Sequence, residues 1–97
     1  MDTYVILRRN GWRTAEDLEQ AAARSKAEGD KTPDEVAWIR SYVLNELDGS
    51  VGTVCIYQAS SPEAIRAHAE RAKLPVDEIV KVADTVIVTA DPVSATI

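Results

Sequence analysis

Residues 54–75 read VCIYQASSPEAIRAHAERAKLP, and this stretch predicts a strand, a tight connection and a helix. The β-branched and aromatic run at residues 54–57 favours a strand. Ser61 is a good N-cap, because its hydroxyl can accept a hydrogen bond from a free backbone N–H of the first helical turn. Pro62 suits the first helical position, where its missing N–H costs little. Pro75 prevents much continuation, so the helix is expected to end shortly before it.

The chain on either side of this stretch adds four elements. Apolar, β-branched runs predict strands, and apolar residues at helical spacing after a Thr14 N-cap predict a helix that Gly29 ends. The expected elements are a strand at residues 3–8, a helix at about 15–28, and strands at 35–44 and 79–89.

The predicted order is therefore β-α-β-β-α-β, with a hairpin turn at Asp48-Gly49 between the two central strands. Right-handed crossovers then give an α+β fold, in which two helices cover one face of a four-stranded antiparallel sheet. This is the ferredoxin-like arrangement. We expect residues 1–90 to form this single domain. Residues 91–97 form a C-terminal tail, which is expected to be loose or to lie on a partner.

The strand at residues 35–44 carries apolar side chains on both of its predicted faces. Strict alternation places Trp38, Arg40 and Tyr42 on one face and Ile39 and Val43 on the other. A small two-layer sheet normally exposes one polar face to water. Two apolar faces suggest that a second subunit covers the side without helices, so we expect a homodimer of the dimeric α/β-barrel type.

Composition excludes several classes of partner. The formal net charge of the 97-residue chain is −5, with 16 acidic against 11 basic residues. Such a surface repels nucleic acid and anionic membranes. A single Cys excludes an internal disulfide and fits a reducing compartment. No signal peptide is visible and no apolar run approaches the ~18 residues of a membrane span, so a soluble, cytoplasmic protein is expected.

Cys55 and His68, the only Cys and the only His, are the candidate metal ligands. Strand and helix periodicity places both on or near the core side, where a thiolate and an imidazole would suit Ni²⁺, Zn²⁺ or Cu. The alternative is a buried thiol and a histidine hydrogen-bonded to the backbone. The pair could also be a nucleophile and its base, although no third, orienting residue is apparent.

Aromatic side chains and an arginine form a second candidate site. Trp38, Arg40 and Tyr42 are expected on one strand face, and Tyr57 can join them from the next strand. Such a pocket could hold a small anionic or planar ligand. Core packing and a subunit interface explain the same residues, and that interpretation is favoured.

Three segments together resemble the bacterial family of small nickel-binding, nickel-responsive proteins, many known only as a domain of unknown function. The segments are Trp38-Ile-Arg-Ser-Tyr-Val43, Cys55-Ile-Tyr-Gln-Ala59 and Glu63-Ala-Ile-Arg-Ala-His-Ala69, followed by Leu74-Pro75 and Ile79. The resemblance covers about residues 36–82. It implies a ferredoxin-like homodimer packed sheet against sheet, Ni²⁺ binding in some members and no established catalysis. Cys55 and His68 match family positions, whereas Gln58 stands where many relatives are expected to carry Glu.

Three functions therefore compete. The first is a small homodimeric protein that binds Ni²⁺ or a similar ion through His68 and Cys55. The second, by analogy of fold alone, is a cofactor-free enzyme or small-molecule binder, with His68 as acid–base and Tyr42, Tyr57 and Arg40 orienting the substrate. The third is an interaction module without chemistry. The first is favoured, and no residue is assigned a catalytic role.

Overall fold

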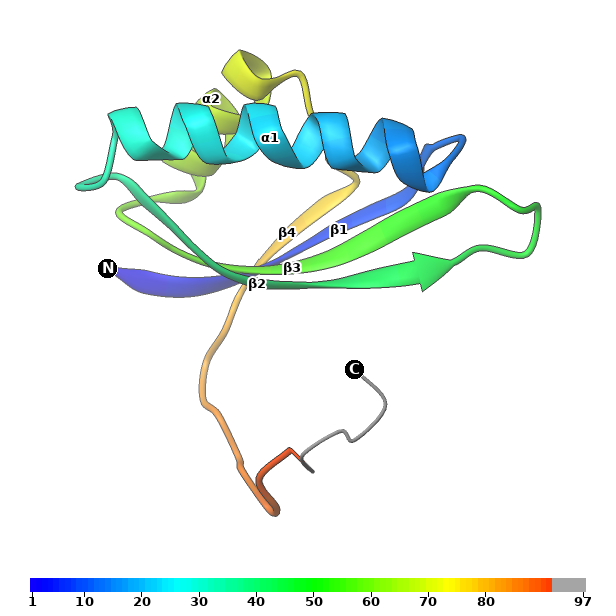
Figure 1. Cartoon of the computed structure of the whole chain (residues 1–97). Helices are drawn as coiled ribbons and strands as arrows, with labels where there is room; N and C mark the ends of the chain where they lie inside the picture. Colours follow the sequence, from blue (N-terminus) through cyan, green and yellow to red (C-terminus); the bar gives the residue numbers. More distant parts are fainter. Residues whose placement is uncertain (92–97) are drawn as a thin grey trace.

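The computed structural model describes residues 1–91 and contains two helices and a four-stranded sheet. In chain order the elements are β1 (Asp2–Trp12), α1 (Ala15–Lys31), β2 (Val36–Asn45), β3 (Val51–Ala59), α2 (Pro62–Ala72) and β4 (Glu78–Lys81). The strand order is β2-β3-β1-β4, and neighbouring strands are antiparallel. Both helices cover the same face of the sheet (Figure 1). The predicted ferredoxin-like fold is confirmed, while the predicted tail beyond Asp91 lies outside the described residues. None of the helices in that part of the chain is both long and apolar enough to span a membrane.

Both helix starts follow the predicted capping chemistry. The Thr14 hydroxyl accepts a hydrogen bond from the N–H of Asp17 at 3.1 Å, and the Ser61 hydroxyl accepts one from the N–H of Ala64 at 3.1 Å. The end of α1 differs from the prediction, because the helix continues through Gly29 to Lys31. Ion pairs between residues three and four apart, such as Lys31 with Glu28, support this last turn.

The last strand is much shorter than the predicted run of residues 79–89. β4 ends at Lys81, and the N–H of Val82 donates to the carbonyl oxygen of Thr3 at 2.9 Å. The partner strand β1 begins at Asp2, so the chain has no further strand to pair with after that bond. The remaining described residues leave the sheet (Figure 1), and the β-branched run 86–88 is exposed.

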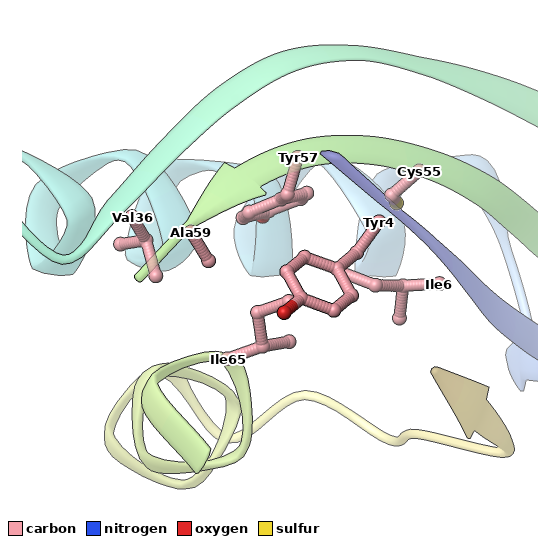
Figure 2. Close-up of a cluster of buried hydrophobic side chains, with 7 residues drawn as sticks. All are labelled: Tyr4, Ile6, Val36, Cys55, Tyr57, Ala59 and Ile65. Carbon is pink, nitrogen blue, oxygen red and sulfur yellow. The ribbon is translucent and has the colours of Figure 1, made fainter. Parts of the chain in front are cut away.

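The hydrophobic core lies between the sheet and the two helices. It is built from alternate residues of the central strands β1 and β3, with one side chain of the edge strand β2 and one of α2 (Figure 2): Tyr4, Ile6, Val36, Cys55, Tyr57, Ala59 and Ile65. The strand periodicity of two therefore places these side chains on one face, as the alternation of an antiparallel sheet requires.

An irregularity in β2 changes which side chains share a face. Trp38 lies opposite Tyr57 and Arg40 lies opposite Ile56, with a register shift between the two pairs. Directly opposite residues point to the same face, and consecutive residues of β3 point to opposite faces. Trp38 therefore faces the helices, whereas Arg40 and Tyr42 face the uncovered side. The predicted common face of these three residues is wrong, because the extra residue of a β-bulge breaks the alternation.

A buried carboxylate joins the hairpin between β2 and β3 to the end of β1. The Glu46 carboxylate lies 2.8 Å from Nη2 of Arg9 and accepts the N–H of Asn10 at 2.7 Å. The side-chain hydrogen bond from Arg9, followed by the backbone hydrogen bond from Asn10, lowers the pKa of Glu46 below its ordinary value.

This pair predicts a loss of stability in acid. The folded state binds the Glu46 proton more weakly than the unfolded chain does. The contribution of the Glu46 contacts to the free energy of unfolding is therefore fully present above the ordinary pKa of Glu, about 4.3. It is lost as the pH falls through the lower pKa of the folded state. Thermal unfolding of the parent and of Glu46→Gln across a pH series should show a gap in Tm at pH 7 that narrows below about pH 4. A gap that stays constant with pH would contradict the assignment.

Candidate functional site

A buried hydrogen-bonded chain of three side chains connects both helices to the sheet. The Ser25 hydroxyl of α1 lies 2.9 Å from the Tyr57 hydroxyl of β3 and 3.1 Å from Nε2 of His68 on α2. All three residues are buried. The ring centroids of Tyr57 and His68 are 5.8 Å apart, and the ring planes are tilted by 59° to each other. Each of the three elements that meet here thus contributes one polar group.

His68 is held as a neutral imidazole, and one of its ring nitrogens has no hydrogen-bond partner within residues 1–91. Burial lowers the pKa of His68, and the charges of Arg71 and Arg8 lower it further. When Nε2 carries the ring hydrogen, it donates to the Ser25 hydroxyl and the lone pair of the ring lies on Nδ1. This Nδ1 atom is buried and has no hydrogen-bond partner among residues 1–91. The imidazole is therefore able to accept a proton, a hydrogen bond or a metal ion.

Tyr57 is held as a protonated phenol. Burial raises the pKa of its hydroxyl, and the hydrogen bond to Ser25 offsets only part of that effect. Its ring stacks on Trp38 at a centroid distance of 6.2 Å and an interplanar angle of 12°. The indole N–H of Trp38 in turn donates to the Ser41 hydroxyl at 2.8 Å. These contacts fix both rings at the border between two cavities.

Two cavities lie on either side of these rings, and Ser25, Trp38 and Tyr57 line both. The first, here called the Arg8 cavity, has a volume of about 230 Å³. Its other lining residues are Arg8, Trp12, Leu18, Glu19, Ala21, Ala22, Ser41, Val43, Thr53, Cys55 and Leu74.

The second space, here called the His68 cavity, has a volume of about 400 Å³. Its other lining residues are Lys26, Gly29, Asp30, Pro33, Val36, Ala37 and His68. It lies beside the last turns of α1, so it brings the His68 ring and the Asp30 side chain to one space.

The two predicted metal ligands line different cavities. Cys55 lines the Arg8 cavity, where its Sγ accepts from the Ser41 hydroxyl at 3.1 Å and donates to the Thr53 hydroxyl at 3.4 Å. These contacts describe a buried, hydrogen-bonded thiol. Across residues 1–91 there is no group of three or more His, Cys, Asp or Glu side chains placed to hold a metal ion.

The bulge in β2 also divides the predicted aromatic pocket. Trp38 and Tyr57 lie at the cavities, while Arg40 and Tyr42 lie on the uncovered face. Gln58 lies between two buried residues of β3, so it too points away from the helices. A carboxylate at that position would therefore not join His68 or Cys55 within one chain.

Sequence reasoning missed two residues of this region. Neither Arg8 nor Ser25 is among the candidate residues named from the sequence. The signal for Arg8 was present, because Tyr4, Ile6 and Arg8 follow the strand period of two and are all buried. Ser25 gave no comparable signal, since its role depends on contacts with two distant elements.

The fold and these cavities define a small α+β protein whose helices enclose a polar chain and two binding spaces. A family model described as nickel responsive protein SCO4226-like matches residues 4–82. The chain therefore belongs to the nickel-responsive, SCO4226-like family. The crystal structure of SCO4226 from Streptomyces coelicolor A3(2) matches with a TM-score of 0.67 and 24% identity, covering 87% of this chain and 99% of that chain. This likeness shows the shared fold. A comparison with curated proteins found no match.

Proposed function

We propose that this protein is a metal-responsive binding protein without catalysis, and that it takes up Ni²⁺ or a similar divalent ion through His68. Membership of the nickel-responsive family supports the proposal. The observation that carries it is the buried Nδ1 atom of His68, which is unpartnered within residues 1–91 while Nε2 is held by Ser25. Metal-binding histidines are typically oriented in this way, by a hydrogen bond from the nitrogen that does not bind the ion.

The donors of the His68 cavity suit a partly hydrated ion better than a closed site. Asp30 is the carboxylate that shares the cavity with His68, and its Oδ2 atom lies 2.9 Å from Nζ of Lys26. One imidazole and one exposed carboxylate leave further coordination positions to water or to groups of a second chain. Ni²⁺ accepts such mixed nitrogen and oxygen ligands.

Calorimetric titration of untagged protein with Ni²⁺ at pH 7 tests this assignment. His68→Ala is expected to abolish binding, because it removes the imidazole. Ser25→Ala is expected to weaken binding about 10- to 100-fold, since it keeps the ligand but releases its orientation.

Cys55→Ser serves as the control, because the thiol lines the other cavity and its replacement is expected to leave the affinity unchanged. A loss of binding in Cys55→Ser would indicate that the thiol of Cys55 is a metal ligand after all. Unchanged binding in His68→Ala would rule out the proposed site. Far-ultraviolet circular dichroism of each variant verifies that the fold is retained.

The uncovered face of the sheet supports the further proposal of a homodimer. Each strand contributes an apolar or aromatic side chain to that face, as the pairing register shows: Val5, Leu7, Tyr42, Val54, Ile56 and Val80. Tyr42 and Val80 are exposed in the single chain. A second copy packed sheet against sheet would remove this apolar surface from water. A cytoplasmic location, supported by the free thiol of Cys55, belongs to the same proposal.

Light scattering coupled to size exclusion tests the dimer. The parent is expected to run at twice the 10.6 kDa of one chain, and Val54→Glu at the mass of one chain, because it buries an unpaired carboxylate in the interface. Ala67→Glu makes a comparable apolar-to-acidic change on the exposed side of α2 and should leave the mass unchanged. A parent protein that is monomeric at the same concentration would refute the interface.

A further inference from the structure

Arg8 is a buried guanidinium with a donor that no residue of 1–91 engages. Its side chain points to the helix face of β1, and the residue is 1% exposed. Nη1 donates to the carbonyl oxygen of Pro75 at 2.7 Å, whereas Nη2 is buried and has no hydrogen-bond partner among the described residues. The ion pairs within residues 1–91 do not include Arg8. We propose that the Arg8 cavity binds a small organic monocarboxylate with an apolar body.

The charge of Arg8 is the first argument for an anion. Burial of a guanidinium without a paired charge is costly, and an opposite charge with hydrogen bonds reduces that cost. The neighbouring Arg9 has the charge partner that Arg8 lacks within residues 1–91, because its Nη2 atom lies 2.8 Å from the Glu46 carboxylate. A carboxylate that enters the Arg8 cavity would supply the charge and the acceptor that Nη2 lacks.

The walls of the cavity argue for an organic body. Apolar side chains from α1, β2 and the chain after α2 form most of the surface around Arg8: Leu18, Ala21, Ala22, Val43 and Leu74, with the ring of Trp12. An inorganic anion would gain nothing from these walls, whereas a hydrocarbon or aromatic group would bury apolar area against them. The volume of about 230 Å³ lies below the range of about 300–1,000 Å³ that is typical of drug-sized ligand sites. This size suits a single ring with a short acid.

The carboxylate of Glu19 beside the cavity favours a ligand that carries only one negative charge. Glu19 of α1 lines the cavity, is exposed, and makes no ion pair with Arg8. The Glu19 carboxylate disfavours a second negative group on the ligand, because like charges repel each other. The Thr53 hydroxyl accepts from Cys55 and keeps its own hydrogen, so it can donate a further hydrogen bond to a carboxylate. This site is distinct from the His68 nitrogen of the proposed function and does not require a metal ion.

Titration of metal-free, untagged protein, in the presence of a chelator, tests the ligand class. Phenylacetate is the probe, phenylacetamide its neutral counterpart and inorganic phosphate the purely ionic one. We expect saturable binding of phenylacetate, at least about tenfold weaker binding of phenylacetamide, and no competition by phosphate, since hydrogen bonds to ionised groups are the stronger ones. Equal binding of acid and amide, effective competition by phosphate, or no binding at all would each overturn the proposal.

Two kinds of variant locate the site. Arg8→Gln removes the charge and should reduce phenylacetate binding to that of the amide. Ala22→Leu fills the cavity from α1 and should abolish binding while Arg8 stays in place, so the test stands even if Arg8→Gln fails to fold. Ala23→Leu is the matched control, because Ala23 is exposed and lies outside the cavity lining. Unchanged binding in Ala22→Leu would place the ligand elsewhere and refute the Arg8 cavity.

Discussion

Ile65→Ala is expected to lower the free energy of unfolding by about 2–5 kcal/mol, the range for large-to-small changes at fully buried sites. Ile65 is 0% exposed and points from α2 toward Tyr4 in the core (Figure 2). Its removal leaves a cavity between the helix and the sheet, and in a chain of 97 residues this loss is a large part of the total stability. Urea unfolding followed by circular dichroism measures the change.

The control for this experiment is Ile87→Ala. Ile87 is 79% exposed in the extended segment after β4, so the same truncation there should change stability by less than about 0.5 kcal/mol. A small effect at Ile65 would mean that α2 packs less closely on the sheet than the structure describes. Equal effects at both positions would contradict the assignment of the core.

Gly52→Ala is expected to destabilise the fold by at least about 1–3 kcal/mol, because a methyl group at this position overlaps the adjacent strand. A Cβ atom there would lie 2.7 Å from the carbonyl oxygen of Arg8 and 2.6 Å from Oε2 of Glu46. The first contact is with backbone, which cannot rotate away. The substitution should therefore also disturb the ion pair between Glu46 and Arg9. Thermal unfolding at pH 7 measures the change.

Gly29→Ala provides the contrasting case. Gly29 lies inside α1, and a Cβ atom there would meet Cε1 of His68 at 3.6 Å, an ordinary contact distance. Alanine loses less backbone entropy than glycine when a helix forms, so this variant should be more stable by about 0.5–1 kcal/mol. The same substitution thus has opposite signs at two glycines. Destabilisation of both variants to the same extent would contradict the packing described at Gly52.

The candidate site shows where prediction from sequence stops. The prediction that His68 faces the core used only the spacing of residues within α2, and the burial of His68 is confirmed. Its relation to Cys55 depended on how α2 lies across the sheet, and the two residues line different cavities. The Ser25 contact that orients His68 joins residues 43 positions apart, so no local pattern could reveal it.

The sequence by itself determined the elements, their order and the helix starts, because these depend on neighbours within a few residues. Ser61 before Pro62 and the hydrophobic period of two are such local signals. Only the tertiary structure decided which face Arg40 occupies, since a bulge in β2 is set by pairing with β3. It also decided where β4 ends, because a strand needs a partner and β1 supplies none beyond its own start. The burial of Arg8 without an acidic partner in the described chain likewise depends on the packing of distant elements.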